Sequence, residues 1–330
     1  MIPRLYVVGG HAKEKAQQKP GEHRYQNGLI ILIDPEAGKA DQCVEYVSPP
    51  EACASDQDPS VLFKAGTLDG DRLFVCTQTE ILVYQVPGFR LENYISLPHF
   101  NDIHHVRPSN EGRLLVANTG LDMVLEIALD GFVHSEWDVL GDTPWSRFTR
   151  NVDYRKVVST QPHQAHPNFV FLNDDEIWVT RFEQRDAVCL NKDGRRIPIQ
   201  HQAPHDGIVF RKKVYFTTVD GHVVKADLGT GQVERLVDLN ELSPTNDALG
   251  WCRGLEVIDD DLVVVGFSRL RPTQWQRNLS WLRKGVGRPG VLPARVALYD
   301  LARPALHWEH IVESSGLDAV FSIHIAEISP

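Results

Sequence analysis

The 330-residue sequence lacks a long hydrophobic run. A transmembrane helix needs about 18 or more consecutive apolar residues, and no such stretch occurs. Near the amino terminus, Arg4 is followed only by Leu5–Val8 before two glycines, which is too short an apolar segment for a secretory signal peptide. We therefore expect neither a membrane span nor a signal peptide, and we expect a cytoplasmic protein.

Cysteine and positive charge are also scarce. The five cysteines form no CxxC pair, which argues against a disulfide framework and against a zinc site built from thiolates. The formal net charge is −10, so the chain lacks the general excess of Lys and Arg with which proteins bind duplex nucleic acid. Glycine and proline are plentiful, at 24 and 20 residues, and they favour many turns between short strands.

Short apolar runs recur along the chain, each beside a turn signal rich in Asp, Asn, Gly or Lys. The runs that follow such turns are Leu73–Cys76, Leu114–Ala117, Ile177–Thr180, Val214–Thr217 and Leu262–Gly266. Each has a short strand before it and further short strands after it. Units of four short strands, roughly 40–50 residues long, are typical of propeller blades. Five such units have their first strands near residues 63, 104, 166, 206 and 253.

The two ends of the sequence supply a sixth unit. Val320–Ile328 has the pattern of a first strand, and Arg4–Gly9, Gly28–Asp34 and Gln42–Tyr46 have the patterns of a second, third and fourth strand. Closing the ring in this way leaves no long free sheet edge. We therefore expect an all-β fold in which residues 1–330 form a single six-bladed β-propeller with four-stranded blades and little helix. The closing blade is shared by the N- and C-termini.

This blade pattern resembles that of the six-bladed propellers of the SMP-30/gluconolactonase, strictosidine-synthase and NHL-type superfamily, over nearly the whole chain. The resemblance lies in the architecture. The chain departs from the SMP-30 enzymes because it has no GEGPxW-type opening that would supply their metal-binding glutamate. The resemblance implies a propeller and no particular reaction, because propellers host both enzymes and binding proteins.

Basic or imidazole side chains stand where each first strand should begin, beside the expected propeller axis. From the middle of a second strand, a step back of eleven residues, or thirteen in one blade, reaches most of these positions. The predicted ring consists of Lys64, His105, His166, His205, Arg253 and His324. Three further polar residues, His104, His163 and Asp206, lie next to it in the sequence.

Four imidazoles from different blades predict a metal site. We expect His105, His166, His205 and His324 to bind a divalent metal ion, Zn, Mn, Fe or Ca, because neutral imidazole is a common metal ligand. The arrangement is similar to that of peptidyl-hydroxyglycine amidating lyase and oligogalacturonate lyase, in which histidines from several blades hold a metal. The alternative is a hydrated polar wall around the axis.

Three long insertions fall at one end of the predicted blades, at about residues 10–27, 141–161 and 268–293. Long loops over one face of a rigid scaffold usually carry function, although they also cap edges or make oligomer contacts. The third insertion is basic and aromatic, and a short helix is expected from Gln274 to Arg283. Four residues of the insertions are predicted to bind substrate: Trp145, Arg269, Arg271 and Trp275.

These patterns predict a metal-dependent lyase, hydrolase or isomerase that acts on an anionic, carbohydrate-like small molecule. Lys64 and Arg253 would hold or neutralise the anion, and Tyr154 or a histidine without metal would be the general base. Two alternatives stay open. One is a non-catalytic propeller that binds a peptide or glycan, and the other is a metal-free enzyme that uses the ring histidines as acid and base. Neither a membrane nor nucleic acid is expected as a partner.

Overall fold

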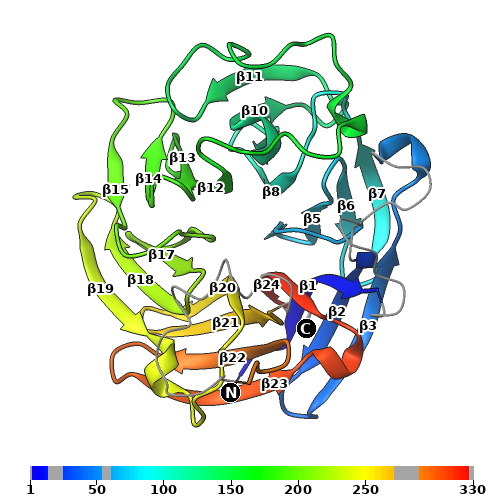
Figure 1. The fold of residues 1–330 in the computed structure, drawn as a ribbon. Coiled ribbons are helices and arrows are strands. Elements are labelled where there is room, and N and C mark those ends of the chain that lie inside the picture. The colour runs from blue at the N-terminus through cyan, green and yellow to red at the C-terminus, as the bar shows by residue number, and fades with distance from the viewer. Residues whose placement is uncertain (1, 14–24, 54–60, 271–289, 327–330) are drawn as a thin grey trace.

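Six four-stranded antiparallel sheets surround a common axis, as Figure 1 shows. The computed structural model describes residues 2–13, 25–53, 61–270 and 290–326. The first strand of each sheet lies toward the axis and the fourth lies at the rim. The expected all-β, six-bladed propeller is therefore confirmed.

The strands of each blade follow one another in the chain, except in the closing blade. The closing blade contains β24 (Ala319–Ile325), β1 (Leu5–Ala12), β2 (Tyr25–Asp34) and β3 (Lys39–Tyr46). The next two blades contain β4 (Thr67–Asp69), β5 (Arg72–Cys76), β6 (Ile81–Gln85) and β7 (Arg90–Ile95), then β8 (Ile103–Pro108), β9 (Leu114–Asn118), β10 (Met123–Ile127) and β11 (Val133–Asp138).

The other three blades have the same order of strands. The first contains β12 (Pro167–Asn173), β13 (Glu176–Arg181), β14 (Asp186–Cys189) and β15 (Arg196–Pro198). The second contains β16 (Ile208–Phe210), β17 (Lys213–Thr218), β18 (His222–Asp227) and β19 (Val233–Asp238). The third contains β20 (Trp251–Asp259), β21 (Leu262–Ser268), β22 (Arg295–Asp300) and β23 (Ala305–Ile311).

The termini close the ring as the sequence predicts. Strand β24 pairs antiparallel with β1, and Leu5 lies opposite Ile325. The backbones of β1 and β24 lie close together at Gly9, where a Cβ atom would lie only 1.7 Å from the carbonyl oxygen of Ala319. Only glycine fits at this position of the closing blade.

The apolar core lies between neighbouring blades. Phe74 of β5, Val116 of β9 and Leu125 of β10 belong to one buried cluster, and comparable clusters fill the other blade interfaces. The second strands are buried on both faces, so their sequences are nearly continuous apolar runs. This packing makes a rigid frame that holds the starts of the inner strands around the axis.

Helical structure is sparse in the part of the chain that the structure describes. It consists of short 3-10 helices: η2 (Pro50–Ala52), η3 (Thr119–Leu121), η4 (Tyr154–Lys156), η5 (Leu239–Leu242) and η7 (Glu313–Ser315). Among the described residues, none of the helices is long and apolar enough to cross a membrane.

Candidate functional site

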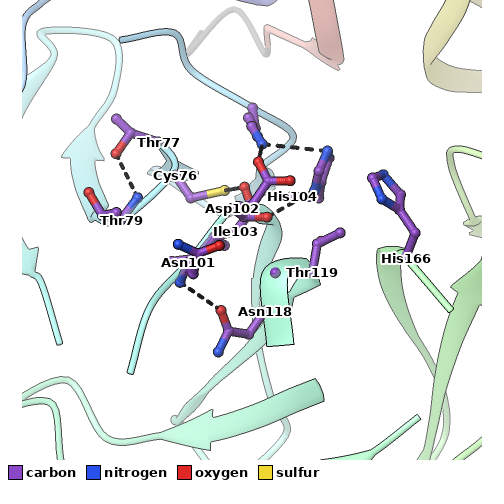
Figure 2. A network of polar contacts seen from close by, with 12 residues as sticks. Cys76, Thr77, Thr79, Asn101, Asp102, Ile103, His104, Asn118, Thr119 and His166 are labelled. Carbon is purple, nitrogen blue, oxygen red and sulfur yellow. Dashed lines mark hydrogen bonds and ion pairs between the residues drawn. The ribbon is translucent and has the colours of Figure 1, made fainter. Parts of the chain in front are cut away.

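The starts of several inner strands bring basic and imidazole side chains together near the axis. The Nζ atom of Lys64 lies 3.5 Å from Nε2 of His104. The ring centroid of His104 lies 4.9 Å from that of His166 and 6.3 Å from that of His205. We call Lys64, Asp102, His104, His166 and His205 the axial cluster. Figure 2 shows His104 between Asp102 and His166.

A buried ion pair lies at the edge of this cluster. The ammonium of Lys64, whose side chain is only 5% exposed, donates a hydrogen bond to Oδ1 of Asp102. Burial alone would raise the pKa of Asp102, but the charge of Lys64, with smaller contributions from His104 and His166, holds that pKa well below its usual value. Asp102 therefore stays ionised and offsets the positive charge of Lys64.

The hydrogen bonds of His104 determine which ring nitrogen carries the proton. Nδ1 lies 3.0 Å from the backbone carbonyl oxygen of Asp102, and a carbonyl oxygen can only accept. Nδ1 is therefore the protonated nitrogen, and the lone pair of Nε2 faces Lys64. Burial, and then the charge of Lys64, lowers the pKa of His104 well below its ordinary value. His104 is a neutral imidazole with an unprotonated nitrogen beside an ammonium.

His166 stands in a turn that Asp122 holds in place. The carboxylate of Asp122 accepts hydrogen bonds from the backbone N–H groups of Gln164, Ala165 and His166 at 2.7 to 3.0 Å. His166 has a φ of 53°, in the left-handed region, which a non-glycine residue keeps only when its surroundings enforce it. Burial lowers the pKa of His166 to about 3, and Nδ1 of His163 lies 2.7 Å from its Nδ1.

His205 lies beside His104 in the axial cluster. Its ring packs edge-on against Phe321 with centroids 5.9 Å apart, and the guanidinium of Arg253 lies 3.6 Å from the same phenyl centroid. Nδ1 of His205 is buried without a hydrogen-bond partner, and it lies 3.8 Å from Oδ1 of Asp206. Burial lowers the pKa of His205, although Asp206 opposes the shift.

Two other histidines of the predicted ring, His105 and His324, have hydrogen-bond partners outside the axial cluster. Nδ1 of His105 accepts a hydrogen bond from the backbone N–H of Val170, and Nε2 bonds to Oγ1 of Thr67. The ring also stacks on Phe169 at 3.6 Å, so His105 fills the space between β4 and β12 and has both nitrogens occupied. Nε2 of His324 lies 3.0 Å from Oγ of Ser322.

A local irregularity of β8 explains why His104 takes the place that the sequence assigns to His105. The register of β8 against β9 pairs Ile103 with Asn118 and His105 with Ala117, so His104 is an extra residue without a partner in the ladder. A bulge of this kind redirects side chains at the end of a strand. Counting residues along the chain assumes regular alternation, which fails at this point.

The axial residues do not fit the predicted metal site. Of the four predicted ligands, His166 and His205 belong to the axial cluster, whereas His105 has no nitrogen left for a metal. In the described ranges, no three donor atoms of the axial cluster lie within 4.8 Å of one another. We therefore derive no chemical step through a metal at the axis.

The loop between β11 and β12 turns its aromatic residues into the core. Tyr154 is buried in an apolar cluster, and its hydroxyl accepts a hydrogen bond from the backbone N–H of Thr149. The indole N–H of Trp145 donates to Glu136 of β11 at 2.9 Å. The structure thus places neither the predicted base Tyr154 nor Trp145 in the axial cluster.

The basic side chains of that loop are already paired. Arg147 forms an ion pair with Asp122, and Arg155 forms one with Asp153. Of the residues predicted to bind substrate from the third insertion, Arg269 forms an ion pair with Glu313. Arg271 and Trp275, like the helix expected from Gln274 to Arg283, lie outside the described residues.

Comparison with known proteins shows the fold alone. No family model matches the chain, and no curated protein matches it. The structure is similar to the crystal structure of a protein of unknown function from Bacteroides caccae, with a TM-score of 0.60 and 13% sequence identity over 98% of each chain. The chain therefore shares a six-bladed propeller fold with that protein, and its chemistry has to be argued from its own residues.

Proposed function

We propose that the protein is an enzyme that uses the neutral imidazoles of the axial cluster as acid and base on an anionic small molecule. The observation that carries this proposal is the unprotonated Nε2 of His104, 3.5 Å from the ammonium of Lys64. A base beside a fixed positive charge can remove a proton and leave the resulting negative charge stabilised.

Each member of the cluster has a distinct part in this proposal. In the proposed reaction, the Lys64 ammonium moves from Nε2 of His104 to the anionic substrate and stabilises the negative charge that develops. Nε2 is then free to accept the proton. Asp102 pairs with Lys64 and fixes its position. The short contact between His166 and His163 offers a path along which a proton passes between neutral imidazoles. The chemistry that suits these groups is proton abstraction, elimination or hydrolysis.

The charges at the axis limit the kind of substrate. Lys64 is balanced by Asp102, so the positive charge near the cluster is smaller than the sequence suggests. Arg253 is a further cation near the cluster, placed over Phe321 and bonded through Nε to Oγ of Ser268. In this proposal its guanidinium binds a carboxylate or phosphate group of the substrate.

A substrate screen tests the proposal. The purified protein is incubated with a panel of carboxylated and phosphorylated sugars, and products are followed by mass spectrometry and by exchange of substrate protons in deuterated water. We expect turnover that falls at least 100-fold in His104→Gln, since a general base contributes about 10²–10⁴ to the rate. His134→Gln, a change to an exposed histidine of β11, is the matched control and should keep full activity.

Two results would contradict this function. Turnover that His104→Gln leaves unchanged would remove His104 from the reaction. Tight binding of a panel compound without any turnover or proton exchange would favour a non-catalytic binding propeller.

A further inference from the structure

A second cluster of metal-binding residue types lies away from the axial cluster, in the blade that begins with β16. His201 belongs to the loop that leads from β15 into β16, Asp220 to the turn between β17 and β18, and His222 to the first position of β18. In the part of the chain that the structure describes, these residues are the one set of three or more His, Cys, Asp or Glu whose donor atoms all lie within 4.8 Å of one another.

The distances within this cluster match those between the ligands of one ion. Nε2 of His201 lies 3.4 Å from Oδ2 of Asp220, and Nδ1 of His222 lies 3.1 Å from Oδ1 of the same carboxylate. Two donors bound to zinc at about 2.0–2.1 Å and at a tetrahedral angle are about 3.3 Å apart. The distances of 3.4 Å and 3.1 Å are close to this value, so the carboxylate of Asp220 can share one ion with the two imidazoles.

Asp238 and Thr218 hold His222 and Asp220 in place, as the residues behind the ligands of a metal site do. Nε2 of His222 lies 3.5 Å from Oδ2 of Asp238, so His222 stands between two carboxylates. A metal-bound histidine commonly turns its second ring nitrogen toward a carboxylate, which fixes the ring and raises its basicity. Oγ1 of Thr218 donates to Oδ1 of Asp220 at 2.6 Å and holds that carboxylate in turn.

The two rings also approach each other closely. The centroids of His201 and His222 are 4.1 Å apart. The side chains of Asp220 and His222 are only 12% and 11% exposed, whereas that of His201 is 34% exposed. The cluster is thus preorganised on one side and open to solvent on the other, which allows an ion to enter.

We propose that His201, Asp220 and His222 bind a divalent transition-metal ion, with zinc the best match. Three protein donors of the types His, His and Asp leave a fourth position for water. The ion joins the β15–β16 loop to the β17–β18 turn. Since His205 follows His201 in the same loop, the ion also steadies the segment that presents His205 to the axial cluster. The site shares no residue with the axial cluster, so its zinc binding can be measured separately from the proposed reaction.

Zinc binding by the full chain tests this assignment. The protein is stripped with a chelator, dialysed and titrated with zinc chloride by calorimetry, with the melting temperature measured in parallel. We expect one zinc ion per chain and a higher melting temperature. His201→Asn should weaken zinc binding at least tenfold, and since this side chain is partly exposed, the variant should fold. His222→Asn should have the same effect.

Two controls separate this site from other histidines. His307→Asn changes an exposed histidine that faces Asp300 at 3.9 Å, and it should bind zinc as the unsubstituted protein does. The double variant His104→Gln/His166→Gln alters the axial cluster and should also retain the ion. The assignment is overturned if no zinc binds, if His201→Asn and His222→Asn bind it unchanged, or if zinc is lost only in the axial double variant.

Discussion

Nε2 of His104 and the ammonium of Lys64 lie 3.5 Å apart beside the propeller axis. The lone pair of the imidazole thus faces the positive charge of the lysine. Lys64 is in turn paired with Asp102. This three-residue arrangement makes the ion pair important for stability as well as for the proposed chemistry.

Removal of Lys64 should destabilise the protein. Lys64→Met leaves the carboxylate of Asp102 without its partner, and loss of one member of a buried ion pair costs about 3–5 kcal/mol. Because the Asp102 side chain is 25% exposed, we expect a loss of about 3 kcal/mol in the free energy of unfolding, measured with urea at pH 7.

The double variant Lys64→Met/Asp102→Asn serves as the control for this change. It removes both charges, so it should recover at least half of the lost stability. A double variant no more stable than Lys64→Met would show that the ion pair is not the source of the loss.

The stability of the protein should fall in mild acid, in part because of His324. Burial lowers the pKa of His324 to about 4, below the value of about 6.5 in an unfolded chain. As the pH falls below about 6.5, His324 binds a proton in the unfolded state but not in the folded state. Folding therefore becomes less favourable as the pH falls to about 4. Between pH 7 and pH 5, His324 accounts for roughly 2 kcal/mol of lost stability.

The variant His324→Gln tests that contribution. Its urea-unfolding free energy should drop by roughly 2 kcal/mol less than that of the unsubstituted protein over the same pH interval. A change at the exposed His134 should leave the pH dependence as it is. An identical pH dependence in His324→Gln and the unsubstituted protein would count against a buried neutral imidazole at this position.

Asp122 should govern the rigidity of the segment that carries His166. Its carboxylate accepts three backbone hydrogen bonds, from Gln164, Ala165 and His166. A hydrogen bond to a charged group contributes about 1.5–3 kcal/mol, which corresponds to roughly 10- to 100-fold in a local opening equilibrium. Asp122→Ala should therefore speed amide hydrogen exchange at these three positions by at least tenfold.

Asp122→Asn keeps an acceptor oxygen and tolerates the left-handed backbone of residue 122, whose φ is 52°. Its exchange rates should lie between those of Asp122→Ala and the unsubstituted protein. Unchanged exchange at residues 164–166 in the alanine variant would mean that other contacts hold this turn.

Closure of the ring should depend on Gly9. A Cβ atom at this position would lie 1.7 Å from the carbonyl oxygen of Ala319, so Gly9→Ala must push β1 and β24 apart. We expect a loss of about 3 kcal/mol or more, on the scale of severe overpacking. Gly88→Ala is the matched control, because a Cβ atom there meets nothing within 4 Å. Equal melting temperatures for the two variants would contradict this view of the closing blade.

The fold could be predicted from the sequence because its signals are local and repeated. Apolar runs such as Leu114–Ala117 and the turns beside them recur in every blade, and the incomplete units at the two ends complement each other. The pairing of β24 with β1 is predicted by the same repeat of four strands per blade. Such patterns survive small irregularities, since one displaced residue does not alter the order of strands.

The axial cluster could be predicted only in part, because it depends on single residues. The sequence predicts Lys64, His166 and His205 near the axis, and the structure brings them together. The bulge that turns His104 inward instead of His105 leaves no signal in the apolar pattern. The sequence does not reveal Asp102, because its pairing with Lys64 joins residues 38 positions apart in the chain.

The proposed chemistry depends on His104 being a neutral base whose Nε2 lone pair faces Lys64. The most direct test is nitrogen-15 NMR of the histidine rings between pH 8 and pH 5.5, with the His104 signals assigned by their loss in His104→Gln. We expect His104 to carry its proton on Nδ1, to leave Nε2 unprotonated, and to show no titration over this range. A charged His104 ring at pH 7, or a proton on Nε2, would contradict the proposed site.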